Sequence, residues 1–136
     1  MYFTKEDIKN KKITIIGLKK SGYSAAKLAY SFGAEVFVSD CEDDNDTRDN
    51  YNKLIKKGIQ CEIGKHSERI FNSNFWVISP GVPKDIDIIR KAGKLNISIL
   101  GEIEFASKFT NKPIIAVTGS NGKSTTVNIL FEMLKV

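Results

Sequence analysis

A glycine- and lysine-containing stretch near the end of the printed sequence has the residue types needed to hold phosphate groups. It reads AVTGSNGKSTTVNILFEMLKV over residues 116–136 and follows two isoleucines. Backbone N–H groups of a glycine loop in front of a helix bind anions, a lysine adds an ammonium, and a serine hydroxyl can ligate Mg²⁺. The pattern therefore predicts a strand over 114–117, a phosphate-binding loop and a helix. The residues expected to contact ATP phosphates are Gly119, Ser120, Asn121, Gly122, Lys123, Ser124 and Thr125, with Ser124 also the candidate magnesium ligand.

The match to the general phosphate-loop pattern G-x-x-x-x-G-K-[ST] is incomplete. Val117 stands where that pattern has its first glycine, so the motif here is the tighter G-x-x-G-K-S. The order of strand, loop and helix favours phosphate binding. The alternative is an ordinary strand-to-helix turn with a solvated lysine.

Composition sets the class of protein. The chain has 136 residues, of which 41% are hydrophobic, and a net charge of +5, which suits one domain with a real core. The basic excess is compatible with a polyanion or a phosphorylated small molecule as ligand, but an excess of this size more often serves solubility alone. No basic run interleaved with aromatic residues is present, which disfavours a nucleic-acid partner. No apolar stretch of about 18 residues and no leader pattern is present, so we expect a cytoplasmic protein without a membrane span.

Cysteine and histidine usage predicts no disulfide framework and no metal centre. Cys41 and Cys61 are too few and too widely spaced, so both are expected to be reduced and structural. His66 is the single histidine and is expected at the surface, without a metal.

Short apolar runs alternate with helical patterns along the chain. Five runs read as strands, namely KITIIG, EVFVSD, IQCEIG, NFWVIS and NISIL. Such alternation predicts an α/β fold with a Rossmann-like five-stranded parallel sheet and flanking helices, followed by the strand, loop and helix of the phosphate-binding motif.

The first strand-to-helix turn, GLKKSG, lies where dinucleotide-binding folds have three glycines. Gly17 and Gly22 occupy the outer positions, but Lys19 replaces the middle glycine, and Asp40 follows the second strand. The incomplete pattern disfavours NAD. A different phosphate-bearing ligand and a purely structural turn both remain open.

A third informative loop, VISPGVP, follows the fourth strand. Pro80 and Pro83 stiffen it, and Gly81 exposes backbone amides at the sheet edge where α/β folds bind ligands. Taken alone, this loop is also explained as a rigid connector.

Together, the motifs GLKKSG, VSD, ISPGVP, GEIEF and AVTGSNGKST resemble in order and spacing those of the Mur ligases of peptidoglycan synthesis. The resemblance is greatest to the branch that adds D-glutamate to UDP-N-acetylmuramoyl-L-alanine. It implies an ATP- and Mg²⁺-dependent amide-forming ligase that works through an acyl phosphate. Of its three implied domains, residues 1–101 would form the first, which binds the UDP-sugar, and residues 102–136 would form the first strand, loop and helix of the central P-loop ATPase domain. The printed sequence would then be an N-terminal portion that is inactive alone. A non-catalytic NAD-type module is the alternative.

The resemblance also assigns roles to particular residues. Lys123 would be catalytic, stabilising charge on the transferring phosphoryl group. The residues implied to bind the UDP-sugar are Lys20, Ser21, Asp40, Cys41, Ser79 and Gly81. Two positions depart from the family pattern, because Lys19 stands for a glycine and Glu42 for a basic residue. Glu42 is expected to repel a diphosphate.

The last helical pattern has an apolar stripe formed by Val127, Leu130, Phe131 and Leu134. Such a stripe must be buried. Three outcomes are open, namely disorder, packing against the first domain and pairing with a second copy of the chain. We expect one of the last two, and pairing with a second copy would be self-association.

Overall fold

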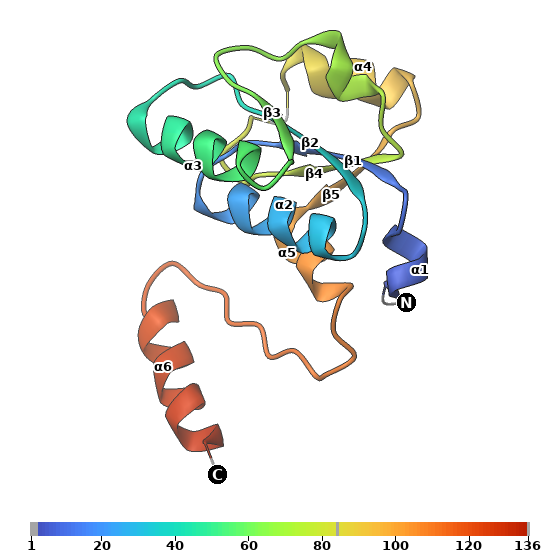
Figure 1. The fold of residues 1–136 in the computed structure, drawn as a ribbon. Helices are drawn as coiled ribbons and strands as arrows, with labels where there is room; N and C mark the ends of the chain where they lie inside the picture. Colours follow the sequence, from blue (N-terminus) through green and yellow to red (C-terminus); the bar gives the residue numbers. More distant parts are fainter. Residues whose placement is uncertain (1–2, 84, 136) are drawn as a thin grey trace.

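Five short parallel strands form the centre of the computed structural model, which describes residues 3–83 and 85–135. Their order is β3-β2-β1-β4-β5, which confirms the predicted five-stranded sheet (Figure 1). The strands are β1 (Lys12–Ile16), β2 (Glu35–Ser39), β3 (Gln60–Glu62), β4 (Phe75–Ile78) and β5 (Ser98–Gly101). The helices are α1 (Lys5–Ile8), α2 (Lys20–Ser31), α3 (Asn45–Ile55), the 3₁₀ helix η1 (Glu68–Phe71), α4 (Asp87–Lys94), α5 (Glu102–Ser107) and α6 (Lys123–Leu134).

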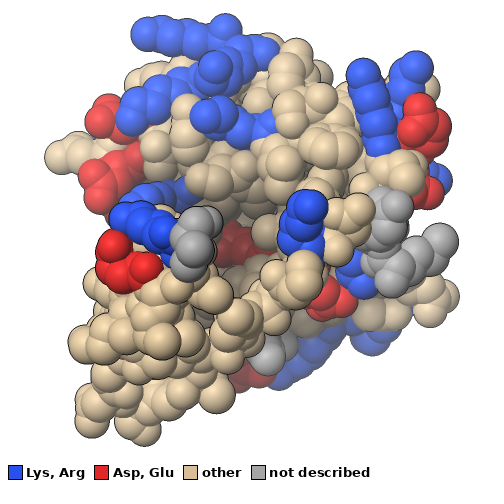
Figure 2. Space-filling model, turned by 90° about the horizontal axis from the view of Figure 1, so that it is seen from below, with Lys and Arg blue, Asp and Glu red and all other residues tan. Residues whose placement is uncertain are grey.

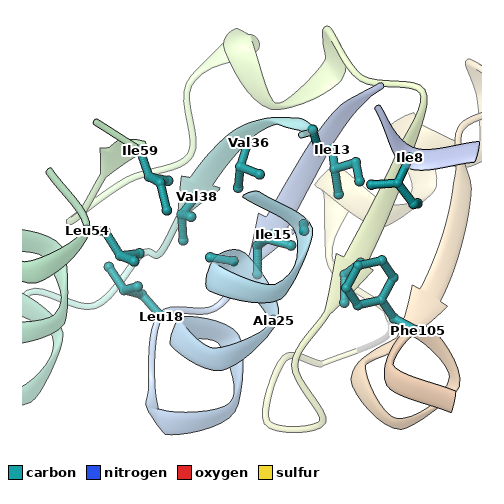
Figure 3. Close-up of a cluster of buried hydrophobic side chains, with 14 residues drawn as sticks. Ile8, Ile13, Ile15, Leu18, Ala25, Val36, Val38, Leu54, Ile59 and Phe105 are labelled. Carbon is teal, nitrogen blue, oxygen red and sulfur yellow. The ribbon is translucent and has the colours of Figure 1, made fainter. Parts of the chain in front are cut away.

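The central strand β1 is buried on both faces because helices cover both sides of the sheet. Successive side chains of a strand point to opposite faces. Ile13 and Ile15 join the larger apolar cluster beneath α2, α3 and α5, which Figure 3 shows. Thr14 and Ile16 face the other side, where the Thr14 hydroxyl donates to the carbonyl of Ile70 at 3.0 Å.

Helix α5 packs on the sheet domain. The ring of Phe105 is fully buried, and its centroid lies 4.9 Å from that of Phe109 and 6.1 Å from that of Phe75. The apolar core therefore continues past residue 101. The boundary expected between 101 and 102 stays a prediction.

The strand predicted over 114–117 is not formed. These residues belong to an irregular segment that runs from α5 to α6 away from the sheet (Figure 1). A parallel strand in the interior of a sheet needs neighbours for its N–H and C=O groups, and no described strand lies beside this segment.

Helix α6 forms as predicted, but its apolar residues are exposed. Val127, Phe131 and Leu134 retain 48%, 59% and 64% of their accessible surface. Packing of α6 against the first domain is therefore not seen in the described residues, whereas pairing with a second copy stays a prediction. Viewed from below (Figure 2), Lys and Arg side chains form separate groups, with a broad uncharged area at the lower left.

Candidate functional site

Three of the loops singled out in the sequence lie at one edge of the sheet, because each follows a parallel strand. β1 ends before the turn of 17–19, β2 ends before Asp40, and β4 ends before Ser79. The chain moves from β1 to β2 on one side and from β4 to β5 on the other. This edge is thus the topological switch point, where open α/β sheets bind their ligands.

Two glycines allow α2 to start very close to β1. Gly17 has a φ of 101°, a conformation that favours glycine. A Cβ atom on Gly22 would lie 2.0 Å from the carbonyl oxygen of Gly17, so only glycine fits there. A Cβ atom on Gly17 would lie 2.7 Å from the Ser79 side chain. The turn is therefore packed directly against the loop that follows β4.

Asp40 connects this turn to the end of β2. It is only 6% exposed, and one carboxylate oxygen accepts from the backbone N–H of Leu18 at 2.6 Å. The other accepts from the N–H of Glu42 at 2.8 Å. Asn50, a residue of α3, donates a hydrogen bond of 3.0 Å to the Leu18 carbonyl. One buried carboxylate thus orders both loops.

Lys19 and Glu42, the two departures from the family pattern, pair with each other. The Lys19 ammonium lies 2.7 Å from a Glu42 carboxylate oxygen and 3.8 Å from one of Asp44. The hydrogen bond to Glu42, assisted by the charge of the same group, raises the pKa of Lys19. The two charges offset each other in the described structure, so Glu42 is not the unopposed negative charge expected from the sequence.

The first turn of α2 is open to solvent. Lys20 and Ser21 are exposed, and the N-cap residue Lys19 makes no side-chain capping bond. The first backbone N–H groups of a helix point outward and favour anions. A groove of about 540 Å³ begins beside this turn and runs between α2 and α5.

The loop of Ser79 to Gly81 reaches this groove through Glu102, one of the residues that line it. The Ser79 hydroxyl donates to the carboxylate of Glu102, which is 8% exposed at the start of α5. A Cβ atom added to Gly81 would meet no atom within 4 Å, so the backbone of this residue is open. Glu102 was not singled out in the sequence, and only the folded chain shows its contact with Ser79.

His66 is not the isolated surface residue that was expected. It is half-buried, and its Nδ1 lies 2.7 Å from the hydroxyl of Ser39, which also donates to Glu62 at 2.7 Å. Burial lowers the pKa of His66, with Asp40 and Glu62 opposing the shift. Burial would raise the pKa of Glu62, but hydrogen bonds from Ser67 and Ser39 outweigh it and the pKa is lowered.

The two cysteines are both free, as predicted, but they differ in environment. Cys41 is exposed beside Asp40 in the loop after β2, so its expected structural role is wrong. Cys61 lies within β3 and packs against the core, and burial raises the pKa of its thiol to about 12. The exposed thiol is therefore the one placed at the site.

The phosphate-loop residues form a helix start without a surrounding pocket. Gly119 and Gly122 have φ angles of 146° and 76°, and Gly122 is the N-cap residue of α6. The Lys123 ammonium donates to the Gly119 carbonyl at 2.5 Å. The loop thus has the predicted glycines and lysine, but all of its residues, 119–125, are exposed to solvent.

Metal ligands are scarce around this loop. Among residues 3–83 and 85–135 there is no group of three His, Cys, Asp or Glu side chains able to hold a metal ion. A hydroxyl such as that of Ser124 usually serves Mg²⁺ together with carboxylates and phosphates. The donor set predicted for Mg²⁺ is therefore incomplete in these residues. No helix in the same residues is long and apolar enough to cross a membrane.

Comparison with known proteins identifies the family. A family model described as the N-terminal domain of the MurD-like Mur ligases matches residues 11–101. The UDP-N-acetylmuramoylalanine–D-glutamate ligase of Chloroherpeton thalassium is 41% identical over 126 residues, which are 93% of this chain and 27% of that protein. The enzyme of the same name from Koribacter versatilis is 41% identical over 130 residues, 95% of this chain and 29% of that protein.

Solved structures agree with this result. The UDP-N-acetylmuramate-alanine ligase MurC of Thermotoga maritima superposes with a TM-score of 0.63 at 27% identity, covering 93% of this chain and 29% of that one. The chain thus spans less than a third of the length of each of these relatives.

Proposed function

The chain belongs to the Mur ligase family as a MurD-like N-terminal domain, and from this premise we propose that it binds UDP-N-acetylmuramoyl-L-alanine for a D-glutamate ligase. One observation supports the location of the site. The turn of 17–22, the loop after Asp40 and the loop of Ser79 to Gly81 meet at the switch point of the sheet.

Each loop has a distinct part in this proposal. The free N–H groups at Lys20 and Ser21 bind the diphosphate, because they stand at an uncapped helix start. Asp40 holds the uracil side through the loop that it orders, and Cys41 lies exposed on that loop. Ser79 and the open backbone of Gly81 close over the nucleotide.

The alternative, an NAD-type module, is less well supported by the geometry. In dinucleotide-binding folds an acid after the second strand binds the ribose, and a central glycine lets the diphosphate approach. Here both oxygens of Asp40 already accept backbone N–H groups, and Lys19 replaces the glycine. Both features argue against NAD.

The full reaction is proposed for a longer enzyme of the relatives' kind. There ATP would transfer its γ-phosphoryl group to the carboxylate of the UDP-linked alanine, and the amine of D-glutamate would displace phosphate from the acyl phosphate. Lys123 would turn from the Gly119 carbonyl to the phosphates and stabilise their charge. Since the reaction consumes ATP and builds a peptidoglycan precursor, we place it in the cytoplasm.

Calorimetric titration tests the binding proposal. UDP-N-acetylmuramoyl-L-alanine should bind the chain and NAD should not. Gly81→Val should abolish binding without lowering the melting temperature, because a side chain there meets only space that the ligand needs. Gly93→Val is the control, because Gly93 is equally open but lies in α4. This variant should bind UDP-N-acetylmuramoyl-L-alanine as the unaltered chain does. Binding of NAD alone would reverse the assignment.

We further propose that this chain has no ligase activity by itself. The described residues lack a metal-binding cluster, and the reaction requires two substrates held together. Phosphate release from ATP should therefore not respond to adding UDP-N-acetylmuramoyl-L-alanine and D-glutamate. Release that depends on both substrates would contradict this proposal.

A further inference from the structure

The ion pair between Lys19 and Glu42 joins two of the loops that make up the proposed site. Lys19 belongs to the turn before α2, and Glu42 belongs to the loop after β2. Their separation is set by Asp40, which holds the N–H of Leu18, the neighbour of Lys19, and the N–H of Glu42 itself. The pair therefore joins two loops whose positions are fixed by buried hydrogen bonds.

Lys19 also partly neutralises an acidic loop. Six acids and one arginine lie within residues 40–49, and that arginine, Arg48, binds Asp43 in two hydrogen bonds. The Lys19 ammonium lies 2.7 Å from a carboxylate oxygen of Glu42 and 3.8 Å from one of Asp44. A diphosphate arriving at the start of α2 meets this lysine beside two competing carboxylates.

We propose that Lys19 is a specificity-determining residue that exchanges Glu42 for the diphosphate of the ligand, so that Glu42 tunes the affinity by competing for the same ammonium. The inference rests on the proposed UDP-sugar site. It explains how a lysine fits where a dinucleotide fold has glycine, because the ammonium supplies the phosphate contact that the closer backbone approach supplies elsewhere.

The exchange is energetically feasible because the existing pair is weak. Lys19 and Glu42 are 60% and 51% exposed in their side chains, and exposed pairs contribute little. A diphosphate has a larger charge than one carboxylate and lies at a helix N-terminus that also favours it. Uridine has no phosphate and should be indifferent to the exchange.

Calorimetry with UDP and with uridine tests the exchange in the 136-residue chain. Glu42→Gln should tighten UDP binding by about two- to fivefold, and Lys19→Gln should weaken it by a similar factor, since an exposed charge pair is worth that much. In the double variant, Glu42→Gln should no longer tighten binding, because the ammonium for which it competes is gone. Affinity for uridine should stay unchanged throughout.

Lys91→Gln and Glu68→Gln are matched controls. They break an exposed pair of similar geometry, 2.6 Å long, which joins α4 to η1, and they change the net charge equally. Neither should alter UDP binding. Equal losses for UDP and uridine in the Lys19 and Glu42 variants would show that the pair only ties the loops together, and would overturn the proposal. UDP affinity that is unchanged in all variants would also overturn it. An unaltered chain that does not bind UDP would refute the proposed function as well.

Discussion

Replacing Asp40 tests whether one buried carboxylate orders the candidate site. Its two oxygens accept from Leu18 at 2.6 Å and from Glu42 at 2.8 Å. Leu18 is fully buried, so water cannot replace the lost acceptor, whereas Glu42 is exposed and water can reach its N–H group. The two bonds should therefore differ in their cost when removed.

The expected losses follow from this difference. In Asp40→Ala the Leu18 N–H is left buried without an acceptor, and the Glu42 N–H loses its hydrogen bond to a charged carboxylate. Such changes cost about 1–3 kcal/mol each, so the free energy of unfolding should fall by about 3 kcal/mol. In Asp40→Asn the amide oxygen still serves Leu18, so the loss should be only about 1 kcal/mol.

Urea unfolding, followed by circular dichroism, measures these losses. Asp49→Ala is the matched control, since this exposed aspartate lies in the same acidic segment and its removal should change stability by no more than about 0.5 kcal/mol. A loss below about 1 kcal/mol for Asp40→Ala would refute the reasoning. So would a loss in Asp40→Asn equal to that in Asp40→Ala, because the amide oxygen would then not be serving Leu18.

Four further predictions concern the core, pH, ATP and self-association. Phe105→Ala should lower the free energy of unfolding by about 3–5 kcal/mol, because the buried ring packs in the core. A loss below about 1 kcal/mol would show that α5 does not pack in that core. Stability should fall as pH drops below about 6.5, because burial lowers the His66 pKa and the unfolded chain therefore binds the proton at higher pH. His66→Asn should flatten this decline between pH 7 and 5, and an unchanged slope would exclude His66 as its source. Calorimetry should show Mg-ATP binding far weaker than micromolar, because every residue of 119–125 is exposed and no pocket formed by the described residues encloses the loop; micromolar binding abolished in Lys123→Ala would contradict this. Sedimentation should detect self-association through α6, in which Phe131 is 59% exposed, and the substitution Phe131→Asp should weaken it. A chain that stays monomeric at the highest soluble concentration would disprove this prediction.

Local patterns in the sequence were sufficient to predict the sheet and the loops that follow its strands. The five apolar runs became β1 to β5, of which β1, β2 and β4 contain buried residues, whereas the outer strands β3 and β5 have none. The glycines at 17 and 22 marked the first turn correctly, since their conformational and steric demands are local. The motifs GLKKSG, ISPGVP and AVTGSNGKST were sufficient to indicate the family.

Contacts between distant residues were not predictable in this way. The approach of His66 to Ser39 and that of Glu102 to Ser79 join residues 27 and 23 positions apart. Neither pair has a characteristic spacing, because the strand order brings the residues together. The pairing of Lys19 with Glu42 was also not predictable, since it joins two loops that meet only in the folded chain.

The segment of 114–117 shows the same difference between local preference and tertiary contacts. Its β-branched residues have strand propensity, and the following glycines and helix appeared where the sequence placed them. Yet a strand exists only when other strands accept its hydrogen bonds, and none lies beside it among the described residues. The sequence thus determined the turns, the helices and the alternation of strands. The tertiary structure alone decided which strands are paired and which charges meet, because both depend on residues far away along the chain.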